Sequence, residues 1–180
     1  MTPRRHHNGI NIISIGRLSK MKNHMLILEA MKLALKVNPK LKLNIAGEGP
    51  ERISLENYIK IHRLSSKVKL LGNREDIPLL LSNADMYIST SLVEGLPLSI
   101  LEAMSNSLPI IATPTGGVTD IVKGSNGILT NPEVENIAMS ILRLANDKEL
   151  RITYGKKSLE IAREFDIKST ISSYETLYAK

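Results

Sequence analysis

Short apolar runs alternate with longer runs in which apolar residues recur every three or four positions. The short runs predict strands at residues 10–15, 41–46, 68–71, 86–89, 110–112 and 127–129. The longer runs predict helices at residues 23–37, 51–64, 77–83, 97–105, 118–122, 133–145, 148–164 and 167–178. Alternating strands and helices predict a parallel sheet with helices on both faces and right-handed crossovers. The expected fold is therefore a Rossmann-like α/β domain of three layers, α/β/α, around a parallel sheet of about six strands.

Polar turns, most of them with glycine, follow every predicted strand but the last. They are Gly16-Arg17, Gly47-Glu48-Gly49-Pro50, Gly72-Asn73-Arg74, Ser89-Thr90-Ser91 with Glu94-Gly95, and Thr113-Pro114-Thr115-Gly116-Gly117. In an open α/β sheet, ligands bind at the carboxyl ends of the strands, where helix amino termini also offer free backbone N–H groups. Glycine is common in any tight turn, but five such turns at one edge favour a ligand site there.

Two pairs of charged residues lie in or beside these turns. Arg17 and Lys22 flank the turn after the first strand, where they could neutralise a diphosphate or serve simply as surface cations. Glu94 lies in a loop, and Glu102 lies eight residues later in an otherwise apolar helix. A carboxylate in such surroundings is costly unless it is paired, which favours a role such as accepting sugar hydroxyls. A place on the exposed stripe of the helix is the alternative explanation of Glu102. Two carboxylates also occur in glycoside hydrolysis, but nothing in the sequence fixes the separation of these two.

Composition and charge narrow the class of protein. The 180 residues are 42% hydrophobic and 23% charged, as in an ordinary globular chain, and about one domain is expected. The net charge of +6 favours an anionic partner, whereas 3% aromatic residues leave few stacking platforms for nucleic acid. The absence of cysteine excludes disulfides and thiolate metal sites and fits a cytoplasmic protein.

Residues 1–9 are expected to be a flexible lead-in or linker, and residues 10–180 the domain itself. The basic start is not followed by the apolar core of a signal peptide, and no apolar run approaches the length of a membrane span.

Several familiar motifs are missing from the sequence. No P-loop occurs, and Gly47-Glu48-Gly49-Pro50-Glu51-Arg52 has arginine where the dinucleotide-binding fingerprint needs its third glycine. There is no Asp-x-Asp sequence and no nucleophile elbow, and the four histidines form no metal-binding set. Dehydrogenase and nucleic-acid functions are therefore weakly supported, and no metal site is expected.

Taken together, the turns resemble the carboxyl-terminal, donor-binding domain of the retaining glycosyltransferases of family 4, the glycosyl transferases group 1, which have the GT-B fold. The resemblance runs from about residue 10 to the end. It is carried by Gly16-Arg17-Leu18 with Lys22, Gly47-Glu48-Gly49-Pro50, Gly72-Asn73-Arg74, Ala84-Asp85-Met86-Tyr87-Ile88-Ser89, Glu94-Gly95-Leu96-Pro97-Leu98 running to Glu102-Ala103-Met104, and Thr115-Gly116-Gly117.

The resemblance implies a role for each matching residue. Arg17 and Lys22 would bind the donor diphosphate and stabilise the leaving nucleotide, and Glu94 would contact the donor sugar near its reacting carbon; these three are the implied catalytic residues. Glu102 would accept the ribose hydroxyls. Gly72, Asn73 and Arg74 would border the base, and Gly95, Leu96 and Pro97 would present backbone to the sugar and phosphates. The other implied donor-binding residues are Gly16, Thr115, Gly116 and Gly117.

The family transfers a sugar from a nucleoside-diphosphate sugar, which is the donor substrate, with retained configuration and usually without a metal or other cofactor. It comprises hexosyltransferases among others and contributes to polysaccharide biosynthesis. The resemblance implies that a GT-B enzyme has an amino-terminal acceptor domain as well, and these 180 residues are expected to correspond to the donor-binding domain alone. The isolated chain is therefore expected to bind donor and turn over little, unless that domain or a separate partner chain positions the acceptor. The full enzyme could also contact the inner face of the membrane peripherally.

Two other functions stay open on the sequence alone. One is a non-catalytic nucleotide-binding module on the same scaffold, and the other is part of a sugar-nucleotide epimerase, which shares this architecture. The base, the sugar and the acceptor are likewise open.

Overall fold

The strands form where short apolar runs place buried side chains on both faces of a sheet. The computed structural model describes residues 9–165. Neighbouring residues such as Ile12 and Ile13 of the first strand are almost completely buried on opposite faces. The strands are β1 (Ile10–Ile15), β2 (Leu41–Ala46), β3 (Val68–Gly72), β4 (Met86–Ser89), β5 (Ile110–Ala112) and β6 (Gly127–Leu129).

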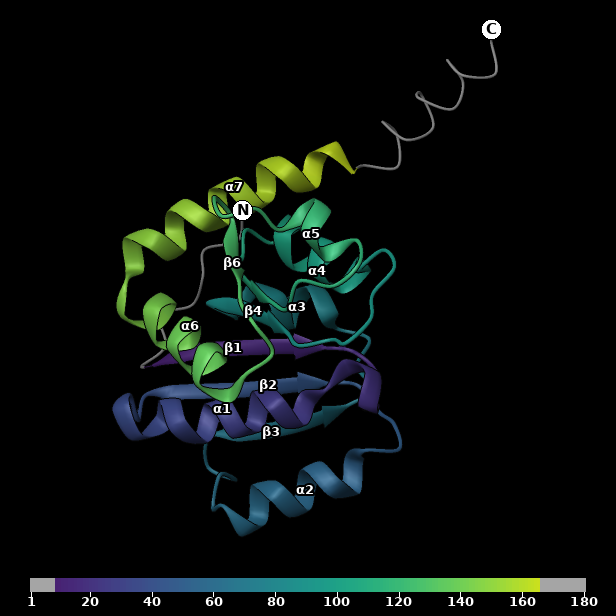
Figure 1. Ribbon diagram of the computed structural model, residues 1–180, viewed down its shortest axis with the longest axis vertical. Helices are drawn as coiled ribbons and strands as arrows, with labels where there is room; N and C mark the ends of the chain where they lie inside the picture. The colour runs from purple at the N-terminus through teal and green to yellow at the C-terminus, as the bar shows by residue number, and fades with distance from the viewer. Residues whose placement is uncertain (1–8, 166–180) are drawn as a thin grey trace, which may run out of the picture.

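All six strands pair in parallel, in the order β3-β2-β1-β4-β5-β6 (Figure 1). This order reverses direction between β1 and β4, because the chain builds outward from β1 to β3 and then returns to build outward from β4 to β6. In doubly wound sheets the crevice at such a reversal, at the carboxyl ends of the strands, is where ligands bind.

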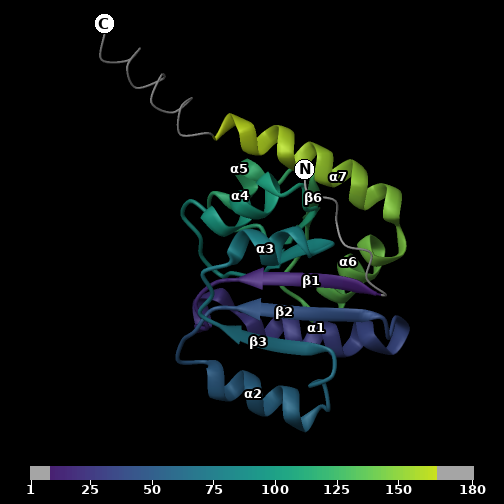
Figure 2. The ribbon, with the colours of Figure 1, turned by 180° about the vertical axis from the view of Figure 1, so that it is seen from behind.

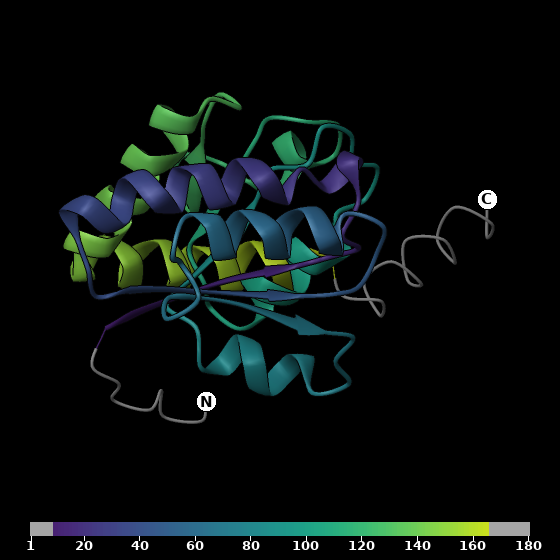
Figure 3. The same ribbon diagram turned by 90° about the horizontal axis from the view of Figure 1, so that it is seen from below.

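Helices cover both faces of the sheet. They are α1 (His24–Val37), α2 (Arg52–Ile61), α3 (Ile77–Ser82), α4 (Leu98–Ser105), α5 (Val118–Ile121), α6 (Val134–Asn146) and α7 (Lys148–Glu164). One buried cluster joins α1, α2 and α6 to the sheet, and a second joins α3, α4 and α5 to its other face. Figure 2 shows α3 and α4 on the face behind that of Figure 1, and Figure 3 shows α1 and α3 on opposite sides of the strands.

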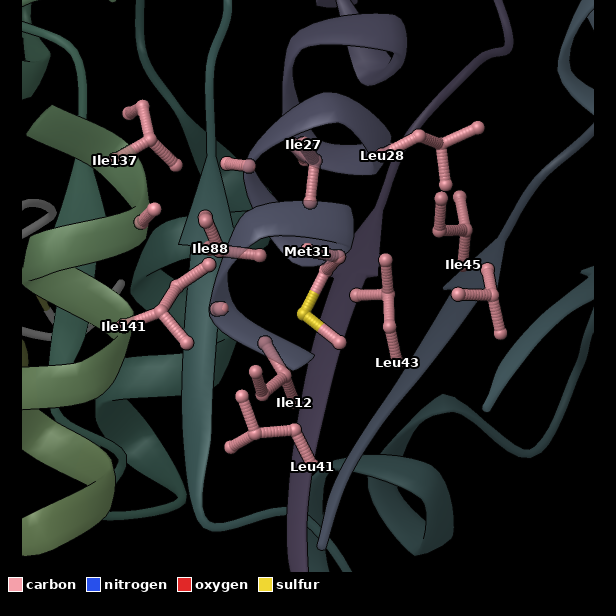
Figure 4. Close-up of a cluster of buried hydrophobic side chains, with 14 of the residues drawn as sticks. Ile12, Ile27, Leu28, Met31, Leu41, Leu43, Ile45, Ile88, Ile137 and Ile141 are labelled. Carbon is pink, nitrogen blue, oxygen red and sulfur yellow. The ribbon is translucent and has the colours of Figure 1, made fainter. Parts of the chain in front are cut away.

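The face under α1 carries the larger core. Ile27 and Met31 of α1 lie over the strands, and Ile137 and Ile141 of α6 close the cluster from the side (Figure 4). The last helix, α7, serves both faces. Its first turns pack against the α1 cluster and its last turns, with Ile161 and Ala162, against the α4 cluster. It therefore passes along the β6 edge of the sheet and fixes the two helical layers to each other (Figure 1).

The predicted fold class is confirmed, and five of the six strands have the predicted bounds. The helix ends differ by up to a few residues. The α2 helix ends at Ile61, because Arg63 has a positive φ of 56° and the Leu64 N–H turns back to the Ile59 carbonyl. A short 3-10 helix, η1 (Lys20–Lys22), was not predicted. The helix predicted at 167–178 lies outside the described residues, as does nearly all of the predicted lead-in.

Candidate functional site

A pocket of about 660 Å³ lies at the carboxyl ends of β1, β2 and β3. Its lining residues come from the turns that follow these three strands: Ile15, Gly16, Arg17, Ala46, Gly47, Glu48, Gly49, Asn73, Arg74 and Ile77. Four of the predicted donor-binding residues, Gly16, Arg17, Asn73 and Arg74, are therefore brought together in one wall. The sequence predicted a ligand site at this edge, and the pocket lies there; ligand binding itself stays a prediction.

The turn after β2 forms the middle of the pocket wall. Gly47 has a φ of 143°, and a Cβ at this position would overlap the Gly16 carbonyl oxygen, so only glycine lets the two turns approach this closely. The Leu18 N–H donates to the Glu48 carbonyl at 2.9 Å. The sequence placed this stretch at the expected ligand edge and among the motifs of the family resemblance, although it fails as a dinucleotide fingerprint. The structure adds that it joins the ends of β1 and β2 and forms part of the pocket.

At the far end of the pocket, Arg74 is held by Asp76. Its Nε and Nη2 donate to the two carboxylate oxygens at 2.7 Å each. These hydrogen bonds lower the pKa of the Asp76 carboxyl and raise that of the guanidinium. Two neighbouring donors of Arg74 are thus occupied, and the plane of its guanidinium is fixed at the pocket rim. Gly72, the remaining predicted residue of this turn, has a φ of 72° and lies close to the Glu48 carboxylate.

The reversal point between β1 and β4 holds an ion pair. The Lys22 ammonium, after β1, contacts Glu94 Oε1, after β4. The Lys22 side chain is 28% exposed and that of Glu94 is 11% exposed. Two residues predicted separately, for the diphosphate and for the sugar, are therefore in direct contact. Arg17, in the turn after β1, is exposed and lines the pocket.

Backbone and hydroxyl contacts tie the loop after β4 to the start of α1. Thr90 Oγ1 donates to the Asn23 carbonyl at 2.9 Å, and the Leu92 N–H donates to the Met21 carbonyl at 2.8 Å. His24, the first residue of α1, is buried, and its Nδ1 has no hydrogen-bond partner among residues 9–165. Burial, and then the charge of Lys22, lower the pKa of His24 to about 4, so this imidazole is neutral at pH 7.

The loop after β5 packs on the same β4 loop from the other side. Gly116 has a φ of 44°, and a Cβ there would overlap the Glu94 carbonyl oxygen, while one on Gly117 would overlap the Gly95 carbonyl oxygen. Thr115 Oγ1 is buried and has no partner within the described part of the chain. Gly116 and Gly117 therefore pack closely against the Glu94 loop. Any contact they make with a ligand stays a prediction.

The Tyr87 hydroxyl contacts both the end of β1 and helix α4. It lies 2.9 Å from Ser99 Oγ of α4 and 3.2 Å from the carbonyl of Ile15, the last residue of β1. Burial raises the pKa of Tyr87 to about 12, so the hydroxyl keeps its proton and can donate. Tyr87 was noted in the sequence only as part of a family motif, and its polar contacts with both sides of the site were missed.

Glu102 lies away from the pocket at β1–β3. It is exposed and lines a separate groove of about 430 Å³ between α4 and α7, together with Leu98, Leu101, Arg163 and Phe165 among others. The premise that its carboxylate is costly within an apolar helix is wrong, because the side chain faces solvent. Its ribose role stays a prediction on the family resemblance alone. Gly95 and Leu96 are exposed in the loop before α4, and Pro97 is buried at the helix start.

Some functional candidates were not singled out by sequence reasoning. Glu48 and Gly49 line the pocket, and Ser91 donates a hydrogen bond to Glu94. Glu48 and Gly49 belonged to a motif of the family resemblance but were given no role, and the only sequence signal for Ser91 was its position in a turn at the carboxyl edge. Within residues 9–165, no group of three or more acidic or histidine side chains is placed to hold a metal ion, and no helix is long and apolar enough to cross a membrane.

Known proteins with similar sequences or structures include several glycosyltransferases. The chain is 32% identical over 176 residues to an Escherichia coli protein named UDP-Gal:alpha-D-GlcNAc-diphosphoundecaprenol alpha-1,3-galactosyltransferase, covering 95% of this chain and 46% of that one. The crystal structure of HepE from Anabaena in complex with UDP-glucose is 28% identical, with a TM-score of 0.88. That match covers 96% of this chain and 50% of HepE.

A third match is the C-terminal domain of a glycosyl transferase group 1 family protein from Francisella tularensis. It is 27% identical with a TM-score of 0.78, and the match covers 88% of this chain and 87% of that domain. The chain thus spans about half of the two longer proteins and nearly all of this single domain. The sequence profile of the family described as glycosyl transferases group 1 matches residues 3–160. The chain therefore belongs to the glycosyl transferases group 1 family.

Proposed function

We propose that the chain is the donor-binding half of a retaining, metal-independent glycosyltransferase that uses a UDP-sugar. The observation that carries this proposal is the contact of Lys22 with Glu94 at the reversal point between β1 and β4, following the turn from which Arg17 lines a pocket large enough for a nucleoside. UDP is the nucleotide in the complex of HepE and in the name of the Escherichia coli relative, which supports uracil over other bases.

In this proposal two cationic side chains stabilise the negative charge of the leaving group. Transfer breaks the bond between the anomeric carbon and the diphosphate oxygen, and the diphosphate leaves with an additional negative charge. Arg17 and Lys22 stabilise that charge as it develops. The acceptor hydroxyl oxygen bonds to the anomeric carbon on the face from which the diphosphate leaves, so the configuration is retained, and the hydroxyl proton passes to an oxygen of the departing diphosphate. Because two cationic side chains neutralise the diphosphate, the step needs no metal ion.

The remaining residues divide the donor between them. Asn73 and Arg74, which follow β3, border the base. The Glu94 carboxylate accepts a hydrogen bond from a hydroxyl of the sugar. Glu102 accepts the ribose hydroxyls, and the backbone of Gly95–Pro97 and of the Thr115–Gly117 loop contacts the sugar and phosphates. The chain on its own binds the donor and transfers little, because a second domain is needed to position the acceptor.

Isothermal titration calorimetry of the 180-residue chain with UDP, GDP, ADP and NAD, with magnesium or with EDTA, tests the proposal. UDP should bind best and equally well in EDTA. At about one hundred times its dissociation constant it should stabilise the fold by about 2.7 kcal/mol, or several degrees in Tm.

Arg17→Ala should weaken UDP binding about tenfold or more, as expected for the loss of a charged hydrogen bond. Arg143→Ala, an exposed arginine on α6, is the matched control and should leave the affinity unchanged. Binding that requires magnesium, or a preference for NAD, would exclude the proposed donor chemistry.

A further inference from the structure

The two oxygens of the Glu94 carboxylate have different surroundings. Oε1 accepts a hydrogen bond from Ser91 Oγ at 2.6 Å and also contacts the Lys22 ammonium. No partner of Oε2 is present among residues 9–165. A carboxylate oxygen has two lone pairs, so Oε1 is saturated by these two donors, whereas Oε2 keeps its full accepting capacity.

Ser91 is itself held rigidly. It is 1% exposed, and its backbone carbonyl accepts a hydrogen bond from Thr113 Oγ1 of the β5 loop at 2.7 Å. Ser89 Oγ lies 3.3 Å from Ser91 Oγ. Since the Ser91 proton goes to Glu94, Ser89 is the donor in that second contact. The Ser91 hydroxyl thus has one orientation available, which points its proton at Oε1.

From this geometry we infer that Ser91 is a positioning residue for Glu94. It fixes the rotation of the carboxylate so that Oε2 faces the donor sugar and accepts one of its hydroxyls. The inference rests on the proposed function, in which Glu94 contacts the sugar. It adds a residue that no other feature of the site had assigned, three positions before Glu94 and itself out of contact with the ligand.

Ser91 matters most once the donor is bound. In the free chain Oε1 has two donors, but a bound diphosphate competes with Glu94 for the Lys22 ammonium. Ser91 then becomes the main contact that holds Oε1. Without its hydroxyl the carboxylate could rotate and divide its accepting capacity between solvent and sugar, so the contact with the sugar would weaken while contacts with the nucleotide would not.

The test compares nucleotide with nucleotide-sugar. Dissociation constants for UDP, UDP-glucose, UDP-galactose and UDP-N-acetylglucosamine are measured by calorimetry on the 180-residue chain and on three variants. Ser91→Ala should weaken the tightest UDP-sugar about tenfold and UDP itself by less than about twofold. Ser91→Thr keeps a hydroxyl and should restore the binding of the UDP-sugar. Ser140→Ala is the matched control, because it removes a buried hydroxyl of α6 that donates to the Asn136 carbonyl of the same helix and touches neither Ser91 nor Glu94.

Each other outcome overturns the inference. Equal weakening of UDP and UDP-sugar would mean that Ser91 only supports the loop. The same selective loss in Ser140→Ala would mean that the effect is not specific to Ser91. Unchanged binding in Ser91→Ala would mean that Lys22 alone orients the carboxylate. If the unmodified chain binds none of the four nucleotides, the proposed function itself fails. A thermal denaturation curve of each variant serves as the control that the variant is folded.

Discussion

Replacement of Gly116 by alanine tests whether the loop after β5 holds Glu94 in place. The backbone of Gly116 is left-handed, with a φ of 44°, and a Cβ there would overlap the Glu94 carbonyl oxygen and lie 3.0 Å from its carbonyl carbon. The left-handed conformation costs alanine about 1 kcal/mol. The overlap adds about 2 kcal/mol, as for other overpacked positions. The expected total is about 3 kcal/mol in the free energy of unfolding.

This loss should lower Tm by about 6 to 12 °C in a chain of this length. To relieve the overlap, one of the two loops must move, and a displacement of about 1 Å at a site can reduce its function about 100-fold. We therefore expect Gly116→Ala to weaken UDP-sugar binding in addition to stability. Thermal denaturation and calorimetry measure the two effects on the same samples.

Gly124→Ala is the matched control. Nothing lies within 4 Å of a Cβ at Gly124, and its φ is not in the left-handed range. This variant should stay within about 0.5 kcal/mol of the unmodified chain. The same Tm and the same affinity for UDP-sugar in Gly116→Ala as in Gly124→Ala would refute this reasoning. The loop after β5 would then not hold Glu94 in place.

Further predictions concern the ion pair and two buried rings. Glu94→Gln removes a negative charge beside Lys22, so pyrophosphate and UDP should bind about fivefold tighter by calorimetry, about 1 kcal/mol; weaker binding would mean that Glu94 does not compete for Lys22. His24 is protonated in the unfolded chain below pH 6.5 but in the folded chain only below about 4. The free energy of unfolding should therefore fall by up to about 3 kcal/mol as pH drops from about 6.5 to 4, and His24→Gln should flatten that slope in urea titrations. Tyr87→Phe should lose about 1 kcal/mol in urea at pH 7, and no loss would show that its hydroxyl contacts are not stabilising.

The fold was predictable because its signal is local. Each strand is a short apolar run closed by a polar turn, and each helix places its apolar residues on one face, as Ile27 and Met31 do in α1. These patterns do not depend on distant parts of the chain. The errors fall where local contacts compete: the end of α2 is decided by the left-handed Arg63, and η1 by the left-handed Asn23 that follows it.

Burial of single polar residues was less predictable. Glu102 has apolar neighbours in sequence, yet it lies on the exposed side of a short helix, because a helix turns its faces every three to four residues. In the sequence Tyr87 was noted only as part of a family motif. In the structure it is buried, and its hydroxyl contacts the carbonyl of Ile15 in β1 and Ser99 Oγ in α4. Which side of an element meets solvent depends on what packs against it, and a single sequence does not contain that information.

The contacts within the site depend on the order of strands. Lys22 and Glu94 are 72 residues apart, and they meet only because β4 returns to pair with β1 after the chain has built β2 and β3 on the other side. The same return places Thr113 and Gly116, which follow β5, against the β4 loop from the opposite flank. An insertion that shifted β4 by one residue would turn its alternate side chains to the other face and remove Ser91 and Glu94 from both neighbours. The residues that carry charge can thus be read from the turns, whereas their mutual contacts, including the hydrogen bond from Ser91 to Glu94, follow from topology.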